Sequence, residues 1–400
     1  MKQPSRTFID GMRRTLSGTA EQNLNLAIHK IVEAKQRGGR VVVVTGSGPN
    51  IHEGVTTLIA SMIHKGLVDG VITSSAVIAH EMGGTLDRVK RIPMGSDDKL
   101  PILPALLPRG DVFELTVLTP QQRASLEPEM AGGWDLYDHY FPHDGNTVIK
   151  AAGNMAWPMG LRTERISLEI RDMARKTGDT FESVAGRAAD AMTMIGAGAA
   201  RGVPVLVSIP QMIGGGAVGF AVGDSTSIES RSRLIADLLG QADVIVESAV
   251  ALTQEIHDGP FETYTGHGIW AAWDGHPTYS LRDKTLVRID LDANLERAWR
   301  MERESSDVQH AVNQGLPKTK RTGIPFRMEM SGFARLEGSI PVTADIGVVW
   351  PIIADACAQA LSVDLDFMSA PQESDEGKQM REWIADHVRF LDRRKLTHAR

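Results

Sequence analysis

The 400-residue chain has only one cysteine, Cys357, no apolar run long enough to cross a bilayer, and no excess of positive charge. One cysteine cannot form an internal disulfide, which favours a reducing, cytoplasmic location. A membrane span needs about 20 apolar residues, and the N-terminal "MKQPSRTFIDGMRR" has no apolar core, so neither a span nor a secretory signal is expected. The net charge of −7 argues against nucleic acid or an anionic membrane as partner.

Several chemical signatures are absent as well. The loop after the first predicted strand, residues 45–54, has neither the GxGxxG dinucleotide fingerprint nor the GxxxxGK[ST] phosphate loop, and the chain has no GxSxG elbow and no HExxH zinc motif. His139, His143 and Asp144 are the right residue types for a metal, but nothing completes a site around them, so no metal is predicted. Cys357 lies in the apolar run "IIADACAQAL" and is expected to be a buried, unreactive thiol.

What the sequence does contain is a strand–loop–helix–strand pattern near its start. Helical periodicity over residues 18–37 ends at two glycines, and a run of four valines follows at 41–44. That run leads into the loop "TGSGPNIHEG", a helix over 55–67 and a short strand over 70–75. A continuous valine run suits a strand covered on both faces, so these elements predict a βαβ unit in a parallel sheet.

The later chain repeats the alternation after an irregular interruption. Residues 98–179, rich in Pro, Gly, His and aromatic residues, are predicted to be an insertion or lid and not a second sheet domain. It separates an N-terminal helix and first βαβ unit (1–97) from the remainder of the α/β domain and a C-terminal helix (180–400). In that remainder the sequence predicts helices over 180–200, 227–240, 348–361 and 373–394, and strands over 203–209, 243–248, 285–292 and 339–347.

Most of these strands end in small or polar residues. Ligands of open parallel sheets lie at the carboxyl ends of the strands, where free N–H groups at helix N-termini suit phosphates. The repeated endings therefore predict a dinucleotide; the alternative is that Gly and Ser merely make tight turns. The expected cofactor-binding residues are Gly46, Ser47, Gly48, Asn50, His52, Thr73, Ser74, Ser75, Gly214, Gly215, Gly216, Glu247, Ser248, Asp290, Asp292, Thr343 and Ala344.

The stretches "GSGPNIHEG" and "HKGLVDGVITSSAVIAHEM" resemble the NAD-binding domain of the archaeal and cyanobacterial type of ornithine cyclodeaminase, also described as lysine-oxoglutarate reductase/saccharopine dehydrogenase-like. His52 with Gly54, and Ala76 with His80 and Glu81, match its two short motifs. Later blocks such as "VPVLVSI", "ADVIVES" and "PVTADIG" follow in the same order.

The resemblance covers roughly residues 25–90 and 180–360, and the architecture is similar to that of deoxyhypusine synthase. It implies an α/β, Rossmann-like, mostly parallel sheet with helices on both faces, NAD as cofactor, and Asp345 beside the nicotinamide.

The sequence also departs from these families. Ser208 and Ile209 are followed by Pro210 and Gln211, where the cyclodeaminases have an Arg-Asp-Asp run, so ornithine as the substrate is in doubt. Near residue 332, where deoxyhypusine synthase has its catalytic lysine, the sequence reads Gly-Phe. Imine transfer onto a protein lysine is therefore not expected.

The candidate catalytic residues are His80, Glu81 and Asp345. A histidine can shuttle a proton near neutrality, and a carboxylate can bind an amine; the alternative is that His80 and Glu81 only cap and solvate a helix. Asn154 and Arg162 are candidates for substrate binding, with a bidentate grip on a carboxylate as the role of Arg162 and loop packing as the equal alternative.

Asp290 and Asp292 end a strand, where an acidic side chain commonly binds a ribose. For Asp292 the alternative is a helix N-cap.

Together these features predict an NAD-binding enzyme that acts on a small amine or amino-acid-like metabolite by transient hydride transfer at a C–N carbon. It would be a lyase or transferase of the cyclodeaminase or deoxyhypusine synthase type. An NAD(P)-dependent dehydrogenase with net redox change and a nucleotide-binding regulatory protein without catalysis stay open. The amphipathic C-terminal helix, with the habit of the family, predicts a homodimer or homotetramer.

Overall fold

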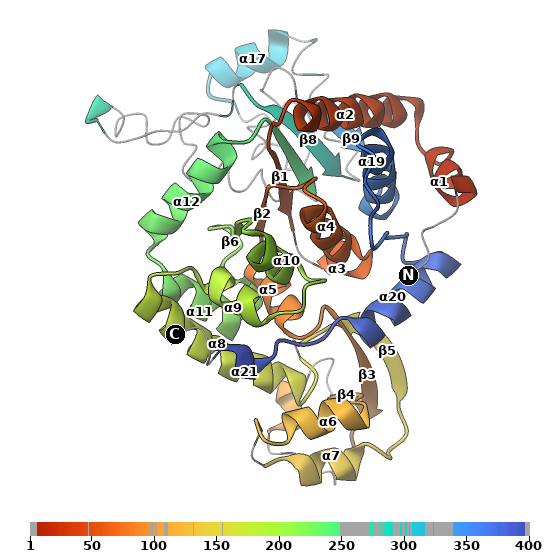
Figure 1. The fold of residues 1–400 in the computed structure, drawn as a ribbon, viewed down its shortest axis with the longest axis vertical. Coiled ribbons are helices and arrows are strands. Elements are labelled where there is room, and N and C mark those ends of the chain that lie inside the picture. Colours follow the sequence, from red (N-terminus) through yellow and green to blue (C-terminus); the bar gives the residue numbers. More distant parts are fainter. Residues whose placement is uncertain are drawn as a thin grey trace.

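The computed structural model describes residues 6–46, 48–95, 100, 102–107, 111–130, 132–153, 155–248, 281, 283–290, 306–316 and 339–396, with isolated residues between 273 and 323. These residues form two sheets (Figure 1). None of the helices described is long and apolar enough to cross a bilayer.

The main sheet has six parallel strands, which confirms the predicted α/β, mostly parallel architecture. Numbered along the chain within this sheet, the strands have the order 3-2-1-4-5-6, the doubly wound order of dinucleotide-binding folds. The strand order reverses between β1 and β7, which pair directly. Across the sheet the strands are β6 (Val205–Val207), β2 (Gly70–Thr73), β1 (Val41–Thr45), β7 (Val244–Ser248), β8 (Thr285–Asp290) and β9 (Ile340–Thr343).

Alternate residues of the strands enter two separate cores. Val41 and Val43 of β1 belong to the larger core, whereas Val42 and Val44 belong to the smaller one. The larger core is covered by α2 (Gly18–Gln36), α4 (Val55–His64), α5 (Ser75–Met82) and α19 (Ile346–Ala360), and the smaller one by α12 (Ile228–Gly240) (Figure 1). Both faces are therefore buried, which is why the strands read as unbroken apolar runs.

Short polar residues begin most of these helices. The hydroxyls of Ser17, Ser74 and Ser227 accept N–H bonds at the starts of α2, α5 and α12. The remaining helices of the α/β part are α1 (Arg6–Arg13), α3 (Gly48–His52), α8 (Met159–Thr177), α9 (Phe181–Ala188), α10 (Met194–Arg201), η2 (Ile213–Gly215), α11 (Ala217–Ser225), α17 (Ser306–Asn313), α20 (Asp375–His387) and α21 (Arg393–Leu396).

The inserted region 98–179 is not irregular, although the sequence had indicated that it would be. Its strands β4 and β5 pair with β3, which precedes it, and form a three-stranded antiparallel sheet, here called the small sheet, in the order β4-β3-β5. Its elements are β3 (Leu86–Pro93), η1 (Pro104–Leu106), β4 (Val112–Thr116), α6 (Pro120–Leu126), α7 (Trp134–Tyr140) and β5 (Asn146–Ala151). An aromatic core joins these helices to the sheet, with Phe113 and Tyr140 in edge-to-face contact. Whether this unit acts as a lid stays a prediction.

Two predicted helices are each divided in two. The helix expected over 180–200 is α9 followed by α10, because Thr193 caps a new helix through its hydroxyl. The helix expected over 373–394 is α20 followed by α21, since the chain turns to an extended conformation at Val388.

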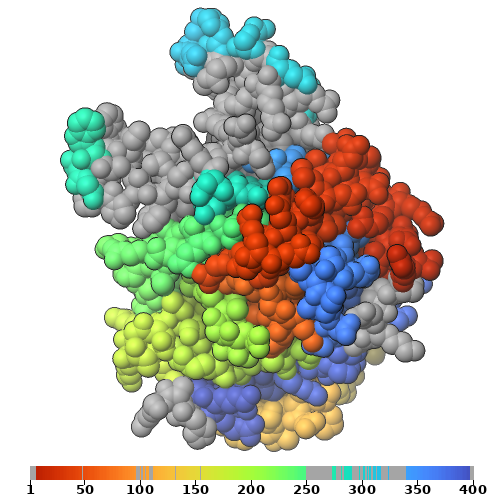
Figure 2. Space-filling view, turned by 45° about the horizontal axis from the view of Figure 1, so that its top comes forward, coloured from red at the N-terminus to blue at the C-terminus, as the bar shows by residue number. Residues whose placement is uncertain are grey.

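Residues 388–396 then run as a strap across the molecule. The N–H of Leu391 donates to Met82 of α5, and that of Asp392 donates to Ala188 of α9. In the space-filling view this blue segment lies between the yellow-green helices and the orange inserted region (Figure 2). Cys357 is buried as expected, and burial raises the pKa of its thiol to about 12.

Candidate functional site

The β1–β7 switch point is held together by two of the predicted cofactor residues. Asn50 is fully buried, and the hydroxyl of Ser248 donates to its Oδ1 at 2.7 Å. The indole of Trp350 donates to the Ser248 hydroxyl at 3.0 Å, and Gly46 N–H donates to the Ser248 carbonyl at 3.3 Å. These bonds tie β1, α3, β7 and α19 at the strand ends, so both polar side chains already have partners within the fold. Their contact with a cofactor stays a prediction.

Two threonines at the same edge are in a different situation. Thr45 and Thr73 are the last residues of β1 and β2, and both are buried. Their hydroxyls have no hydrogen-bond partner among the described residues. By alternation from Val43 and Val71 they point to the same face of the sheet. A buried hydroxyl without a partner is costly, so a polar ligand at this edge would remove that cost.

The glycine loop 213–216 packs onto the start of α5. The N–H of Gly215 donates to the Ser75 hydroxyl at 2.9 Å, and the N–H of Ser75 donates to the Gln211 carbonyl at 3.2 Å. A Cβ at position 215 would lie 2.8 Å from the Ser75 backbone, so this contact requires glycine there. A Cβ at Gly48, Gly214 or Gly216 would meet open space. Ser47 and Asp292 lie outside the described residues.

Further along the edge, β7 and β8 carry a row of buried charges. Arg288 lies 3.7 Å from Glu247 and 3.3 Å from Asp290, and all three side chains are buried. Arg288 was missed by sequence reasoning; the signal was a lone arginine inside the apolar strand "TLVRID". Glu247 and Asp290 therefore lie beside a cation of the protein itself. The next strand, β9, ends at Thr343, followed by Ala344.

Asp345 caps α19 and lies near a second carboxyl. Its Oδ1 accepts from the N–H of Gly347 at 2.7 Å. Glu53 accepts from the N–H of Gln372 at 2.7 Å. Burial, with a smaller contribution from the charge of Asp345, raises the pKa of Glu53 to about 7. In the sequence, Glu53 follows His52 in the predicted nucleotide loop, where the pair was expected to position cofactor or substrate. The structure places its carboxyl beside Gly347 at the start of α19, next to Asp345.

His80 and Glu81, predicted together, have separate environments. Glu81 is fully buried, and its two oxygens accept from the N–H groups of Met194 and Ile195 at 2.8 and 3.1 Å. It therefore caps α10, and burial raises its pKa to about 7. Its catalytic role stays a prediction that would require these bonds to break.

His80 Nδ1 lies 2.7 Å from the carbonyl oxygen of Ala152. A carbonyl can only accept, so Nδ1 carries the proton and Nε2 keeps a lone pair. Burial lowers the pKa of His80, which favours this neutral imidazole.

Around His80 the structure brings together a set of side chains, here called the polar cluster: His52, His80, Asp87 and Lys150. The charge of Lys150 lowers the pKa values of both histidines and of Asp87, although burial is the largest influence on each. Lys150 lies directly opposite Asp87 in the β3–β5 pairing. Sequence reasoning missed Asp87 and Lys150, because nothing local marks two strands that pair across a long insertion.

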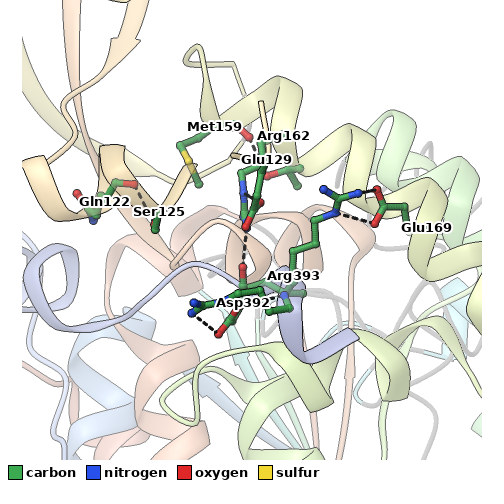
Figure 3. A network of polar contacts seen from close by, with 11 residues as sticks. Gln122, Ser125, Glu129, Met159, Arg162, Glu169, Asp392 and Arg393 are labelled. Atoms are coloured by element: carbon green, nitrogen blue, oxygen red, sulfur yellow. Dashed lines mark hydrogen bonds and ion pairs between the residues drawn. The ribbon is translucent and has the colours of Figure 1, made fainter. Parts of the chain in front are cut away.

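Arg162 lies away from the polar cluster, in the network of Figure 3. Its Nε donates to Glu129 at 2.8 Å (Figure 3). Its Nη2 donates to the carbonyl of Leu391 at 2.8 Å, and the guanidinium lies over the Phe390 ring. Arg393 and Glu169 form a neighbouring ion pair at 2.6 Å. These contacts hold the strap to α8, so the predicted grip on a substrate carboxylate would require their rupture. Asn154 lies outside the described residues.

Within the described ranges, no group of three or more His, Cys, Asp or Glu side chains is arranged to hold a metal ion. At the edge of the sheet, the buried hydroxyls of Thr45 and Thr73 have no partner among the described residues, and Gly48, Gly214 and Gly216 border open space.

Comparison with known proteins gives only distant similarities. No known family matches the sequence, and neither does any curated protein. Among solved structures, AgrE in its ternary complex with ornithine and NAD+ is 10% identical with a TM-score of 0.38, over 90% of this chain and 35% of AgrE.

A conserved protein from Methanococcus maripaludis S2 designated LOR/SDH is also 10% identical, with a TM-score of 0.38 over 87% of this chain and 71% of that one. ArgZ, an arginine dihydrolase from cyanobacteria, is 10% identical with a TM-score of 0.37, over 85% and 33%. The chain thus spans about a third of the length of AgrE and ArgZ.

Proposed function

We propose that the protein is an NAD-binding enzyme that acts on a small nitrogen-containing metabolite by transient hydride transfer at a carbon bonded to nitrogen. The observation that carries the proposal is the doubly wound strand order, with two unpartnered buried hydroxyls at its β1 and β2 ends. Dinucleotides bind folds of this order in the crevice outside the strand ends.

The residues present fit such a cofactor. Thr45 and Thr73 would offer hydroxyls to its polar groups, and the open space beside Gly48 would allow close approach of the backbone. The row of Glu247, Arg288 and Asp290 continues along the same edge of the sheet. When bound, the cofactor supplies the hydride acceptor; the protein supplies binding, orientation and proton transfer.

The chain's own acid–base groups lie in the polar cluster. His80 presents an Nε2 lone pair, held in this tautomer by the Ala152 carbonyl. A neutral imidazole can accept a proton without first losing one, which suits a proton shuttle beside the reacting carbon near neutral pH. An amine or amino-acid-like substrate is therefore the class proposed, and the enzyme class is a lyase or transferase in which the hydride returns within the turnover.

The cofactor test is a thermal shift and binding titration with NAD and NADP. A ligand specific for the folded state raises the melting temperature. Thr45→Val should weaken NAD binding about fivefold, because one hydrogen bond contributes about 1 kcal/mol. Thr116→Val is the matched control, since the Thr116 hydroxyl of β4 is also buried without a partner but lies in the small sheet. If millimolar NAD and NADP both leave the melting transition unmoved, the proposal is wrong.

The reaction test is turnover of diamines and basic amino acids by the NAD-loaded protein. Transient transfer predicts a slower reaction with substrate deuterated at the C–N carbon and no accumulation of reduced nucleotide. Accumulation of reduced nucleotide would instead indicate a dehydrogenase, and firm NAD binding without any turnover would indicate a regulatory binder. Sedimentation tests the proposed homodimer or homotetramer; a concentration-independent monomer would contradict it.

A further inference from the structure

One face of the small sheet carries four charged side chains, two acidic and two basic, and both basic side chains pair with the same carboxylate. Asp87 and Arg91 are four residues apart on β3, with Lys150 of β5 opposite Asp87 and Glu114 of β4 opposite Arg91. Alternation in strands places all four on the same face. Glu114 takes both cations: its oxygens lie 3.0 Å from Arg91 and 2.6 Å from Lys150. The ammonium of Lys150 is thereby directed away from the Asp87 carboxylate.

Among the described residues, Asp87 has a single, weak hydrogen bond. Its Oδ2 accepts from the N–H of Gly153 at 3.4 Å. The side chain is half-buried, unlike the fully buried Glu81. Burial outweighs the Gly153 bond and the charge of Lys150, and raises the pKa of Asp87 to about 7. Asp87 is therefore partly exposed as a residue, and its carboxyl can exchange a proton near neutrality.

Two glycines bring this carboxyl against α5. A Cβ at Gly83 would lie 2.7 Å from the N of Gly153, and a Cβ at Gly153 would lie 2.8 Å from the Thr163 hydroxyl. This close packing at the end of β5 also brings the Ala152 carbonyl to His80. Asp87 and His80 are thus held by the same two consecutive residues, Ala152 and Gly153, at the junction of the two sheets.

The other carboxyls with raised pKa values are occupied. Both oxygens of Glu81 accept backbone N–H bonds from α10. Glu53 is almost fully buried and is bonded by Gln372. Among the described residues, the charged group that acts on Asp87 is Lys150 from β5, which is paired with Glu114 from β4. Lys150 also acts on His80 of α5 and His52 of α3.

We propose that Asp87 is a catalytic residue that takes the proton from a substrate ammonium group, and that Lys150 is a positioning residue that sets how readily Asp87 does so. The assignment rests on the proposed function, because it concerns the nitrogen of that reaction. In the step, an N–H bond of the ammonium breaks and the electron pair stays on nitrogen, while an O–H bond forms on Asp87. A protonated amine has no lone pair to expel a hydride, so this transfer must come first.

The raised pKa of Asp87 affects how fast it can accept a proton from the ammonium group. A pKa of about 7 in place of the usual 3.8 makes Asp87 a stronger base by about a thousandfold. An ordinary aspartate would be too weak a base to deprotonate an alkylammonium group at a useful rate, because proton transfer follows the difference in acidity.

The first experiment needs no substrate. The protein labelled with 13C at aspartate carboxyls is titrated by NMR, so that glutamates are silent. One aspartate should titrate near pH 7, should be absent from Asp87→Asn, and should move to higher pH in Lys150→Met, because the cation lowers its pKa. Asp135→Asn, an exposed carboxyl in the first turn of α7, is the control. If every aspartate titrates in the acidic range, the proposal is overturned.

The second experiment repeats this titration with propylammonium as probe and propanol as its uncharged control. An ammonium bound beside Asp87 should lower its midpoint, since a nearby opposite charge favours the ionised form. A midpoint that does not respond to propylammonium overturns the proposal, whatever NAD does. If propylammonium shifts the Asp87 midpoint but the protein does not bind NAD, the amine site is supported and the proposed hydride transfer is wrong. Failure of the Asp87 proposal can therefore be told apart from failure of the proposed function.

The third experiment applies once a substrate turns over. Asp87→Asn should lower kcat by roughly 10²–10⁴, the usual contribution of a positioned acid–base group. NAD affinity should stay within twofold or so, because the Asp87 carboxyl would act on the substrate and not on the cofactor. Wild-type kcat in Asp87→Asn, with NAD bound and substrate consumed, would remove Asp87 from the reaction and leave the proposed function intact.

Discussion

Replacing Arg162 by methionine tests whether this arginine holds the fold together or acts on substrate. Arg162→Met keeps an unbranched chain of similar length but removes the guanidinium. Three contacts would be lost: the ion pair with Glu129, the hydrogen bond to the Leu391 carbonyl, and the contact with the Phe390 ring. Two of these hold the strap 388–396 against α8.

The magnitude follows from the burial of the pair. The Arg162 side chain is 2% exposed and that of Glu129 is 15% exposed. Removing one partner of a buried ion pair costs about 3–5 kcal/mol, because the other charge is left without compensation. Since Glu129 keeps some contact with water, the lower end applies, and Arg162→Met should lose about 3 kcal/mol of stability. That is a large fraction of the roughly 5–15 kcal/mol that stabilises a typical domain.

The assay is equilibrium unfolding in urea, followed by circular dichroism, with NAD affinity measured on the same samples. Arg165→Met is the control, because Arg165 is exposed on the same helix and should change stability by less than about 0.5 kcal/mol. Hydrogen exchange at the Leu391 and Asp392 amides should also speed up in Arg162→Met, since their bonds to α5 and α9 depend on the strap. Unchanged stability with lost turnover would refute this reasoning and restore the substrate role expected from sequence.

Two further predictions concern proton chemistry. His80→Gln should lower turnover by roughly 10²–10⁴ while leaving NAD affinity little changed, with exposed His139→Gln as the control; unchanged turnover would remove His80 from the mechanism. The pKa of Glu53 is raised in the folded state from 4.5 to about 7, so its ionised form destabilises the fold above that pH, and the penalty fades as pH falls towards 4.5. The free energy of unfolding of Glu53→Gln, taken relative to wild type, should therefore increase by about 2 kcal/mol as the pH rises from about 5.5 to about 8. The exposed control Glu376→Gln should show no such increase. Urea midpoints across this range decide it, and a pH-independent difference would contradict the assigned burial.

The main sheet was predictable because its evidence is local. Unbroken valine runs such as 41–44 favour strands covered on both faces, and helical periodicity with serine caps marks the crossovers. The order of these elements was enough to predict a parallel α/β fold. The small sheet escaped prediction because β3 is "LDRVKRIP", whose charged residues resemble a loop when read alone. Its β structure is stabilised by pairing with β4 and β5, which local sequence does not show.

The candidate site divides in the same way. The sequence by itself determined which polar residues follow the strands, among them Thr73, Asn50, His80 and Asp345. Only the tertiary structure decided which of them have protein partners, because those partners come from distant parts of the chain. The carboxylate of Glu81 is occupied by the N-terminus of α10, and Asn50 by Ser248.

The same dependence on distant contacts made Asp87 and Lys150 invisible in the sequence. Antiparallel pairing of β3 with β5 places them opposite each other, and Glu114 from a third strand then takes the lysine. A carboxyl's pKa depends on desolvation and on the charges around it in space, neither of which follows a period of two or 3.6 residues along the chain. The sequence therefore determined the main sheet and the set of polar residues that follow its strands. The packing of distant segments against one another decided which carboxyl groups have raised pKa values.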